Sequence, residues 1–465
     1  MSKYEPVSAE VVAALQTALG AEYVRTDAET LEKYKTDEET DPRYHHLPEV
    51  VVWPGSTEEV AAVMKIANRY NVPVTPRSAG TSVSCGAIPV YGGIVLLLER
   101  MDKIEELNTE GMYMVVEAGA RTVEIQEKAN AAGFLYAGDP CSADSCLIGG
   151  NIATNAGGNK AVRYGTTRDQ VYAIEAVTPT GDIVNVGARL KKKSTGYCLE
   201  QLIMGSEGTL GIITKATLKL LPLCPYKLDL LAIFTDLDKA VGLVPNLIKA
   251  GLNPTSVEFM DNAFVRSSSD YCELKLPHYE DGFYVIVTVE TFNEDELESK
   301  MEQLDEICSA SGATDVLEAD DRVWKLRRNC LESTRVLSLV STSDDLVVPV
   351  DQIANCIRHL TKVAENYNFK LFTLAHAGDG NLHFQILKGE MSDEQWEDEV
   401  SRFHAEAYPY VYSLGGRLSG EHGIGAKKVE AMEKYTEPVE MKMMKEIKRA
   451  LDPKNILNPG KVFNA

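Results

Sequence analysis

Residues 139–169 read DPCSADSCLIGGNIATNAGGNKAVRYGTTRD. Up to about residue 165 this segment is rich in Gly, Asn, Ser and Thr and has neither a helical nor a strand period. A long ordered loop or series of turns inside a globular domain generally has a functional reason. Because glycine has no Cβ atom, it also lets the backbone approach a flat ligand closely. We therefore expect ligand-binding turns here.

Two further loops of small residues lie in the same half of the chain. PRSAGTS (76–82) follows an expected strand, and GSEGTLG (205–211) precedes another. Such loops can turn successive backbone N–H groups toward a pyrophosphate. PRSAGTS matches neither the G-x-G-x-x-G fingerprint nor the phosphate loop G-x-x-x-x-G-K-[ST]. Each alone is compatible with a simple tight turn, but three in one α/β domain favour a cofactor site.

Size and charge restrict the class of protein. The chain has 465 residues, enough for two or three domains, and a formal net charge of −22. This charge disfavours nucleic acid and anionic membranes as partners. We expect no membrane insertion and no signal peptide, and therefore a cytoplasmic location. Nine cysteines at irregular spacing fit a reducing compartment, and Cys141 with Cys146 is too little for an iron–sulfur cluster.

Hydrophobic periodicity predicts two blocks of α/β character on either side of a proline-rich segment, LPLCP at 221–225. The first block is predicted to contain a helix at 122–132 and strands at 49–53, 72–76, 94–98, 113–117, 171–177 and 183–187. The second is predicted to contain strands at 228–234, 283–289 and 346–350 and helices at 237–250, 293–311, 321–337, 351–367 and 393–413. The predicted divisions are a helical N-terminal lead at 1–45, then 46–225, 226–413, and a C-terminal segment at 414–465.

The second block carries a group of histidines. HAGDGNLH spans His376 to His383, and the Gly-Asp-Gly-Asn between them is a tight-turn signal. A hairpin there would bring the two imidazoles together at the mouth of the turn. In GEHGIG (420–425), Glu421 offers an oxygen ligand to a metal, and His422 beside it is available as a base. The alternative is that these histidines lie in unrelated surface turns, since H-x6-H is not a standard zinc spacing.

The motifs together resemble a known family. PRSAGTSVSCG, the segment at 139–169 and GSEGTLGIIT look like the flavin-binding half of the vanillyl-alcohol-oxidase superfamily, with its PCMH-type FAD-binding domain. HAGDGNLH, SGEHGIG and LDPKNILNPGK resemble its glycolate oxidase/D-lactate dehydrogenase branch. The resemblance covers about residues 40–463 in family order. It implies an α+β fold: a two-subdomain FAD-binding domain, an α+β substrate cap domain, and a C-terminal segment that returns to the FAD domain.

The resemblance also implies roles for residues. His376, His383 and Glu421 would be metal ligands, and His422 the catalytic base. Arg327 would bind the substrate carboxylate, although a surface ion pair is the alternative. Thr81 stands where some relatives carry a histidine bonded to the flavin, so we expect non-covalent FAD. The expected FAD-binding residues are Pro76, Arg77, Ser78, Ala79, Gly80, Thr81, Ser82, Asp139, Pro140, Gly149, Gly150, Asn151, Thr154, Gly157, Glu207, Gly208, Gly211, Ile213 and Asn458.

The implied chemistry is oxidation of a 2-hydroxy acid to the 2-oxo acid. The hydroxyl would bind one divalent metal (Fe, Zn or Mn), His422 would take its proton, and hydride would pass to flavin N5. D-Lactate is the expected substrate. Ser343, where relatives that take a second carboxylate tend to carry a lysine, favours a small monocarboxylate over D-2-hydroxyglutarate; glycolate is a further alternative.

The fate of the electrons leaves other functions open. The resemblance implies transfer to an electron-transfer flavoprotein, as in electron-bifurcating lactate dehydrogenases, or to an iron–sulfur subunit. The rival functions are an oxidase that returns electrons to O₂ or a family member that acts on a larger alcohol, and, as a second class, a flavoprotein subunit that mainly relays electrons in a complex.

Overall fold

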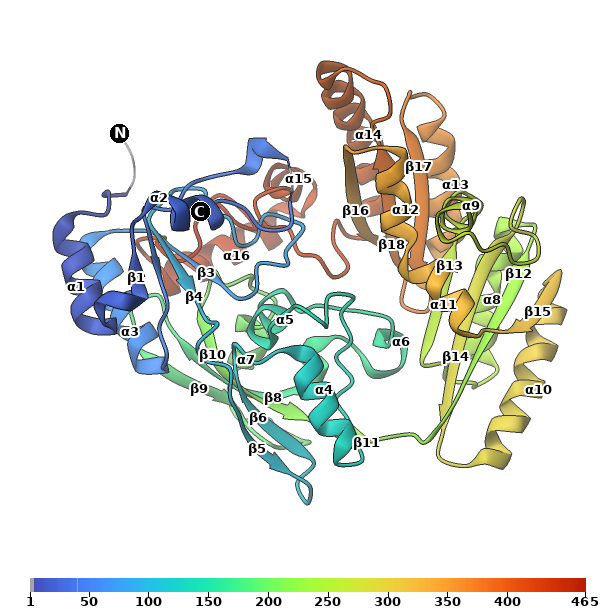
Figure 1. Ribbon diagram of the computed structural model, residues 1–465, viewed down its shortest axis with the longest axis horizontal. Coiled ribbons are helices and arrows are strands. Elements are labelled where there is room, and N and C mark those ends of the chain that lie inside the picture. The colour runs from blue at the N-terminus through green and yellow to red at the C-terminus, as the bar shows by residue number, and fades with distance from the viewer. Residues whose placement is uncertain (1–3, 40) are drawn as a thin grey trace. The chain divides into compact units, whose positions relative to one another are not determined.

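The computed structural model describes residues 4–39 and 41–465. The chain forms two compact units (Figure 1). Unit 1 runs to Gly157, resumes over Gly165–Leu223 and ends with Glu421–Ala465; unit 2 comprises Gly158–Tyr164 and Cys224–Gly420. The chain enters the main part of unit 2 within the LPLCP segment.

Unit 1 contains a small, partly parallel sheet of order β1-β2-β4-β3, in which β4 pairs in parallel with β2 and β3. Its apolar core includes α1 and α3, which begin at the side-chain caps Ser8 and Ser56. The strands are Val24–Arg25 (β1), Val50–Val52 (β2), Val74–Arg77 (β3) and Ile94–Leu97 (β4). The helices beside them are Ala9–Leu19 (α1), Ala28–Lys33 (α2) and Thr57–Tyr70 (α3).

The second sheet of unit 1 is antiparallel, with the order β5-β6-β10-β8-β9. Its strands are Ile104–Asn108 (β5), Tyr113–Glu117 (β6), Val171–Val177 (β8), Ile183–Gly187 (β9) and Ile212–Lys219 (β10). Phe134–Leu135 (β7) pairs with Leu221–Pro222 (β11). The remaining helices of unit 1 are Thr122–Ala131 (α4), Ile148–Thr154 (α5), Leu199–Ile203 (α7), Val429–Tyr435 (α15) and Pro438–Leu451 (α16).

Unit 2 is built on one antiparallel sheet of order β15-β12-β14-β13-β17-β18-β16. Its strands are Tyr226–Phe234 (β12), Ser256–Met260 (β13), Phe283–Thr291 (β14), Asp315–Glu318 (β15), Ser341–Val347 (β16), Lys370–His376 (β17) and Asn381–Leu387 (β18).

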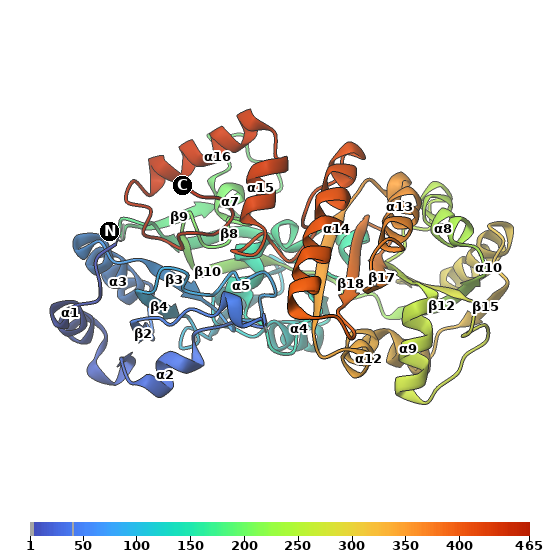
Figure 2. The ribbon, with the colours of Figure 1, turned by 90° about the horizontal axis from the view of Figure 1, so that it is seen from above.

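Two groups of helices pack against this sheet from opposite sides (Figure 2). One group is Leu237–Lys249 (α8), Glu294–Ala310 (α10), Ile353–Ala364 (α13) and Asp393–Ser413 (α14). The other is Asn262–Cys272 (α9), Asp321–Arg328 (α11) and Cys330–Leu337 (α12). Short 3₁₀ turns occur at Ala21–Tyr23, Pro42–Tyr44, Thr167–Gln170 and Val350–Gln352.

Several expectations differ from the structure. The N-terminal lead is not only helical, because β1 pairs with β2 and so joins the first sheet. The helix predicted at 321–337 is interrupted at Asn329, and the strand predicted at 346–350 lies earlier, at Ser341–Val347. The segment expected to consist of turns contains α5 and the short helix Ala161–Tyr164 (α6).

The helix α6 belongs to unit 2, although its sequence lies between two parts of unit 1. Arg163 donates to Thr255 Oγ1 at 3.0 Å and to the carbonyl of Glu290 at 3.2 Å. Tyr164 donates its hydroxyl to the Glu290 carboxylate at 3.0 Å. These contacts explain why residues 158–164 belong to unit 2, although the predicted division placed them in the segment 46–225.

Candidate functional site

The histidine hairpin forms as predicted. β17 and β18 pair antiparallel, with His376 opposite Asn381 and His383 opposite Leu374. The two imidazole rings lie perpendicular to each other with their centroids 5.1 Å apart. Gly380 in the turn has φ +87°, and a Cβ atom there would lie 2.0 Å from the Val348 carbonyl oxygen. The turn therefore requires glycine at this position.

A buried carboxylate, Glu258, orients His376. Glu258 Oε1 lies 2.7 Å from His376 Nδ1, and its Oε2 accepts from Arg327 Nε at 3.1 Å and Nη2 at 2.7 Å. Burial alone would favour the neutral acid, but the charges and hydrogen bonds of His376 and Arg327 outweigh it and lower the pKa of Glu258. A carboxylate on one ring nitrogen fixes the orientation of an imidazole whose other nitrogen can bind a metal.

Arg327 lies at the C-terminal end of α11, and the guanidinium edge formed by Nε and Nη2 faces Glu258. That edge cannot grip a substrate carboxylate while it holds Glu258. The ion pair foreseen as the alternative role of Arg327 is present, although it is buried rather than on the surface. A substrate-binding role for Arg327 stays a prediction.

Asp345 on β16 links the hairpin to the segment that precedes Glu421. This buried carboxylate accepts from Asn381 Nδ2 at 2.7 Å, Ser419 Oγ at 2.6 Å and the Gly420 backbone N–H at 3.1 Å. Asp345 and His383 are also paired across β16 and β18. Gly420 is thus held close to the histidine hairpin within unit 2.

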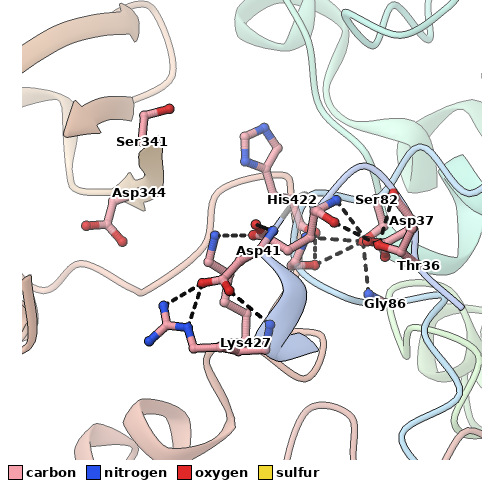
Figure 3. A network of polar contacts seen from close by, with 12 residues as sticks. Thr36, Asp37, Asp41, Ser82, Gly86, Ser341, Asp344, His422 and Lys427 are labelled. Atoms are coloured by element: carbon pink, nitrogen blue, oxygen red, sulfur yellow. Dashed lines mark hydrogen bonds and ion pairs between the residues drawn. The ribbon is translucent and has the colours of Figure 1, made fainter. Parts of the chain in front are cut away.

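In unit 1, Glu421 and His422 lie on a loop that several hydrogen bonds hold in place. The side chain of His422 is shown in Figure 3. The side chain of Glu421 is 10% exposed, and its Oε1 lies 3.7 Å from His422 Nε2. The His422 carbonyl accepts from Ser84 Oγ at 2.9 Å. Just beyond, the backbone N–H groups of Ile424 and Gly425 each donate to the carboxylate of Glu207 at 2.7 Å. Regular secondary structure does not hold this loop; specific hydrogen bonds do.

The three glycine loops of unit 1 meet as expected for one cofactor site. A Cβ atom on Gly150 would lie 3.2 Å from Ser78 Cβ, and one on Gly208 would lie 2.9 Å from Pro76 Cγ. Asn458 joins them through its side-chain amide, which donates to the Glu207 carbonyl at 2.7 Å, and through its backbone N–H, which donates to Val74. The final segment Glu421–Ala465 thus packs within unit 1, whereas residues 414–420 of the predicted C-terminal segment belong to unit 2.

Other predicted cofactor residues have structural partners. Arg77 donates to the Thr36 carbonyl at 2.6 Å, and Asn151 donates to Thr122 Oγ1 at 2.7 Å. Ile213 lies on β10 of the second sheet and is buried in the apolar core there. Their side chains support the loops, so any contact with a cofactor would come mainly from the backbone beside them. Within the same loops, Thr154 Oγ1 donates to the Gly150 carbonyl at 3.0 Å, and Ser82 Oγ accepts from the Gly86 N–H at 3.0 Å. The other predicted cofactor residues along these segments are Ala79, Gly80, Thr81, Asp139, Pro140 and Gly211.

The site fits a bound flavin. The Oδ1 atom of Asn458 and the Oγ atom of Ser206 are buried and have no hydrogen-bond partner among the residues that the structure describes. A flavin ring offers donors and acceptors to such atoms, while Gly150 and Gly208 let the surrounding loops pack closely against each other.

Sequence reasoning missed Glu258 and the bridging role of Asp345. The signal for Glu258 is a single charged residue in SVEFM, a strand that is buried along its whole length. A charged side chain in such a strand requires a partner.

Two family models match this chain. The model described as FAD linked oxidases, C-terminal domain, matches residues 227–462, and the model described as FAD binding domain matches residues 48–187. The chain belongs to the FAD-linked oxidases. The family membership confirms the predicted FAD-binding and C-terminal oxidase domains, and this FAD-linked oxidase is an FAD-dependent oxidoreductase.

Similar proteins agree with the family. The chain is 37% identical to the D-lactate dehydrogenase of Anaerostipes hadrus, over 89% of both chains. It is 35% identical to the glycolate oxidase subunit GlcD of Bacillus subtilis (strain 168), over 91% of this chain and 90% of that one. A structure of p-cresol methylhydroxylase shares the fold of this FAD-linked oxidase, with a TM-score of 0.84 at 17% identity over 97% and 96% of the two chains. Across residues 4–39 and 41–465, no helix has the length and apolar character needed to cross a bilayer.

Proposed function

We propose that this FAD-linked oxidase is a metal-dependent dehydrogenase that oxidises a small D-2-hydroxy acid, with D-lactate preferred, to the 2-oxo acid. The names of its relatives support the substrate class, since they include a D-lactate dehydrogenase and a glycolate oxidase subunit. The observation that supports a metal requirement is the pair of imidazole rings whose centroids lie 5.1 Å apart, one of them oriented by the buried Glu258.

Glu421 is the proposed third ligand. Gly420 is hydrogen-bonded to Asp345, which is paired with His383 across the sheet. Since consecutive Cα atoms are about 3.8 Å apart, the residue after Gly420 begins near the hairpin. Two imidazoles and one carboxylate, with further positions left for substrate, are typical of a catalytic metal site and suit zinc, iron or manganese.

The side chains would share the remaining work. His422 would accept the substrate hydroxyl proton at one of its ring nitrogens. Arg327, anchored by Glu258, would place positive charge near the substrate carboxylate. When bound, a divalent metal would lower the pKa of the hydroxyl. FAD would accept the hydride.

The preference for a monocarboxylate follows from Ser343, which offers no positive charge on β16 to a second carboxylate. Glycolate and D-2-hydroxyglutarate are the alternative substrates. We further propose a cytoplasmic enzyme whose electrons pass to an electron-transfer flavoprotein, or alternatively to an iron–sulfur subunit. An enzyme whose main task is electron relay in such a complex is the second candidate function.

The test is anaerobic bleaching of the visible flavin band by D-lactate, before and after removal of metal with a chelator. We expect rapid bleaching that chelation abolishes and added Zn²⁺, Fe²⁺ or Mn²⁺ restores. L-Lactate, glycolate and D-2-hydroxyglutarate serve as comparison substrates. Absence of bleaching by all four acids in metal-replete protein would exclude the hydroxy-acid function and leave the relay function. Bleaching that survives complete metal removal would exclude the metal requirement alone.

A further inference from the structure

We propose that Glu207 is a positioning residue for the reaction: its carboxylate fixes the loop that carries Glu421 and His422. The sequence assigned Glu207 to the FAD-binding loop GSEGTLG. In the structure its two carboxylate oxygens are turned instead toward the backbone of the GEHGIG loop. The inference rests on the proposed function, because it concerns the base and ligand assigned there.

The two carboxylate oxygens of Glu207 accept hydrogen bonds from two consecutive backbone amides, those of Ile424 and Gly425, and we call this contact the Glu207 clamp. Oε1 accepts from the Ile424 N–H at 2.7 Å, and Oε2 accepts from the Gly425 N–H at 2.7 Å. Hydrogen bonds to an ionised acceptor are stronger than those between neutral groups. A Gln or Asn side chain has only one oxygen and could accept from only one of these two amides in the same way. Two neighbouring N–H groups therefore match a carboxylate in particular.

The loop is shaped to admit this carboxylate. Gly423 has φ +82°, and a Cβ atom there would lie 2.9 Å from Glu207 Cδ. Gly425 has φ +55°, and a Cβ atom there would lie 1.8 Å from the Ser84 carbonyl oxygen. The two glycines that follow His422 thus let the loop pass tightly between Glu207 and Ser84.

Glu207 is itself held firmly. It has φ +53°, a strained conformation for a residue with a side chain, and its backbone N–H donates to the Ala153 carbonyl at 2.7 Å. Its own carbonyl accepts from Asn458 Nδ2 at 2.7 Å. A strained backbone persists only where surrounding contacts impose it. Glu207 thereby ties the loop with His422 to two segments of the flavin site, at α5 and at Asn458.

The position of His422 follows from these contacts. The Ile424 amide lies only two residues after His422, and Ser84 holds the His422 carbonyl on the other side. Proton transfer needs the base within hydrogen-bond reach of its proton, so a small shift of the loop lowers the rate steeply. Glu207 therefore acts on catalysis through His422, without touching substrate.

The experiment compares Glu207→Gln with Glu200→Gln in the intact, FAD-loaded protein. Glu200 is a matched control, because it is 8% exposed, as Glu207 is, and lies in the same stretch of chain, but its carboxylate pairs with Lys193 at 2.7 Å. Hydrogen exchange of the Ile424 and Gly425 amides and steady-state kinetics are measured for each. For Glu207→Gln we expect exchange at least about tenfold faster and kcat lower by about 10- to 100-fold, with KM changed by less than about twofold. Glu200→Gln should alter neither.

Three outcomes would overturn the clamp. The first is rapid exchange of the Ile424 and Gly425 amides in the wild-type protein, which requires no variant to fold. The second is wild-type exchange and kcat in Glu207→Gln. The third is an equal loss of kcat in Glu200→Gln, which would indicate a general effect of buried carboxylates here. If the wild-type protein oxidises no 2-hydroxy acid, the proposed function fails, while the exchange measurement still decides whether the clamp exists.

Discussion

Two buried glutamates support the candidate site, and they differ in what they bind. Glu258 in unit 2 binds two side chains that can carry positive charge, Arg327 and His376. Glu207 in unit 1 binds two neutral backbone amides. The pKa of Glu258 is lowered, because its charged partners outweigh burial, whereas burial outweighs the amides and raises the pKa of Glu207.

The difference corresponds to what each glutamate holds in place. The strands β17 and β18 already fix the backbone of the hairpin, so only the His376 ring needs orientation. The loop at 420–425 has no strand partner for most of its length, so its backbone needs to be fixed. A charged partner suits the first task and a pair of N–H donors suits the second.

The largest expected effect comes from removing the buried ion pair between Glu258 and Arg327. Glu258→Ala leaves the guanidinium of Arg327 buried without this carboxylate and should lower the free energy of unfolding of unit 2 by about 3–5 kcal/mol. Urea unfolding followed by the fluorescence of Trp324 and Trp396, which lie in unit 2, would measure it.

A paired variant sharpens this first test. Glu258→Ala combined with Arg327→Met should recover part of the lost stability, because the buried cation is then also removed.

Glu207→Ala should lower the free energy of unfolding by less, about 1–3 kcal/mol, because it leaves only amides without an acceptor. If Glu207→Ala destabilises the protein as much as Glu258→Ala, the kind of partner does not explain the difference between the two glutamates.

Whether a feature of the fold or of the candidate site could be predicted from the sequence depends on how far apart in the chain its contacting residues lie. The hairpin was predictable because HAGDGNLH contains both histidines and the turn that joins them. The strands β6, β8 and β9 and the helix α14 were predicted at their observed bounds, because local periodicity defines them.

Contacts between distant segments were not predictable from one sequence. Glu258 and His376, which are 118 positions apart in the chain, meet because β13 pairs with β17. The Glu207 clamp joins residues 217 and 218 positions apart. The interruption at Asn329 also had no warning from Pro or Gly, because an Asn with φ −96° and ψ 10° ends the helix there.

A second, smaller effect is expected in the hairpin turn. Gly380→Ala introduces a Cβ atom at φ +87° and 2.0 Å from the Val348 carbonyl, so it should destabilise unit 2 by about 2–3 kcal/mol. Gly389→Ala is a matched control, because Gly389 has φ +59° with open space around it; about 1 kcal/mol is expected there. Equal effects in urea unfolding of the two variants would mean that the hairpin turn is not under the steric restriction described.

A third test asks whether burial shifts the pKa of a lysine with a neutral partner, as it shifts the pKa of Glu207. Lys461 in unit 1 donates to the Ile88 carbonyl, a neutral partner, and burial lowers its pKa to about 8. A lysine that binds its proton less tightly when folded makes stability rise with pH between about 8 and 10.5. From pH 8 to pH 10 the wild-type protein should gain about 2 kcal/mol more than Lys461→Met, measured by urea unfolding followed by flavin release. Parallel pH profiles of the two proteins would show that Lys461 keeps an ordinary pKa when folded.

The smallest expected effect concerns the second anchor of the His422 loop. Ser84→Ala removes the hydroxyl that donates to the His422 carbonyl at 2.9 Å and should lower the stability of unit 1 by about 1 kcal/mol. Ser413→Ala removes a similar bond, to the Tyr410 carbonyl, from an exposed helix end and should cost only a few tenths of a kcal/mol. If Ser84→Ala leaves stability and kcat unchanged, Glu207 alone fixes the loop. If it lowers kcat as much as Glu207→Gln, the loop depends on both anchors together, because a backbone held at one point can still turn about it.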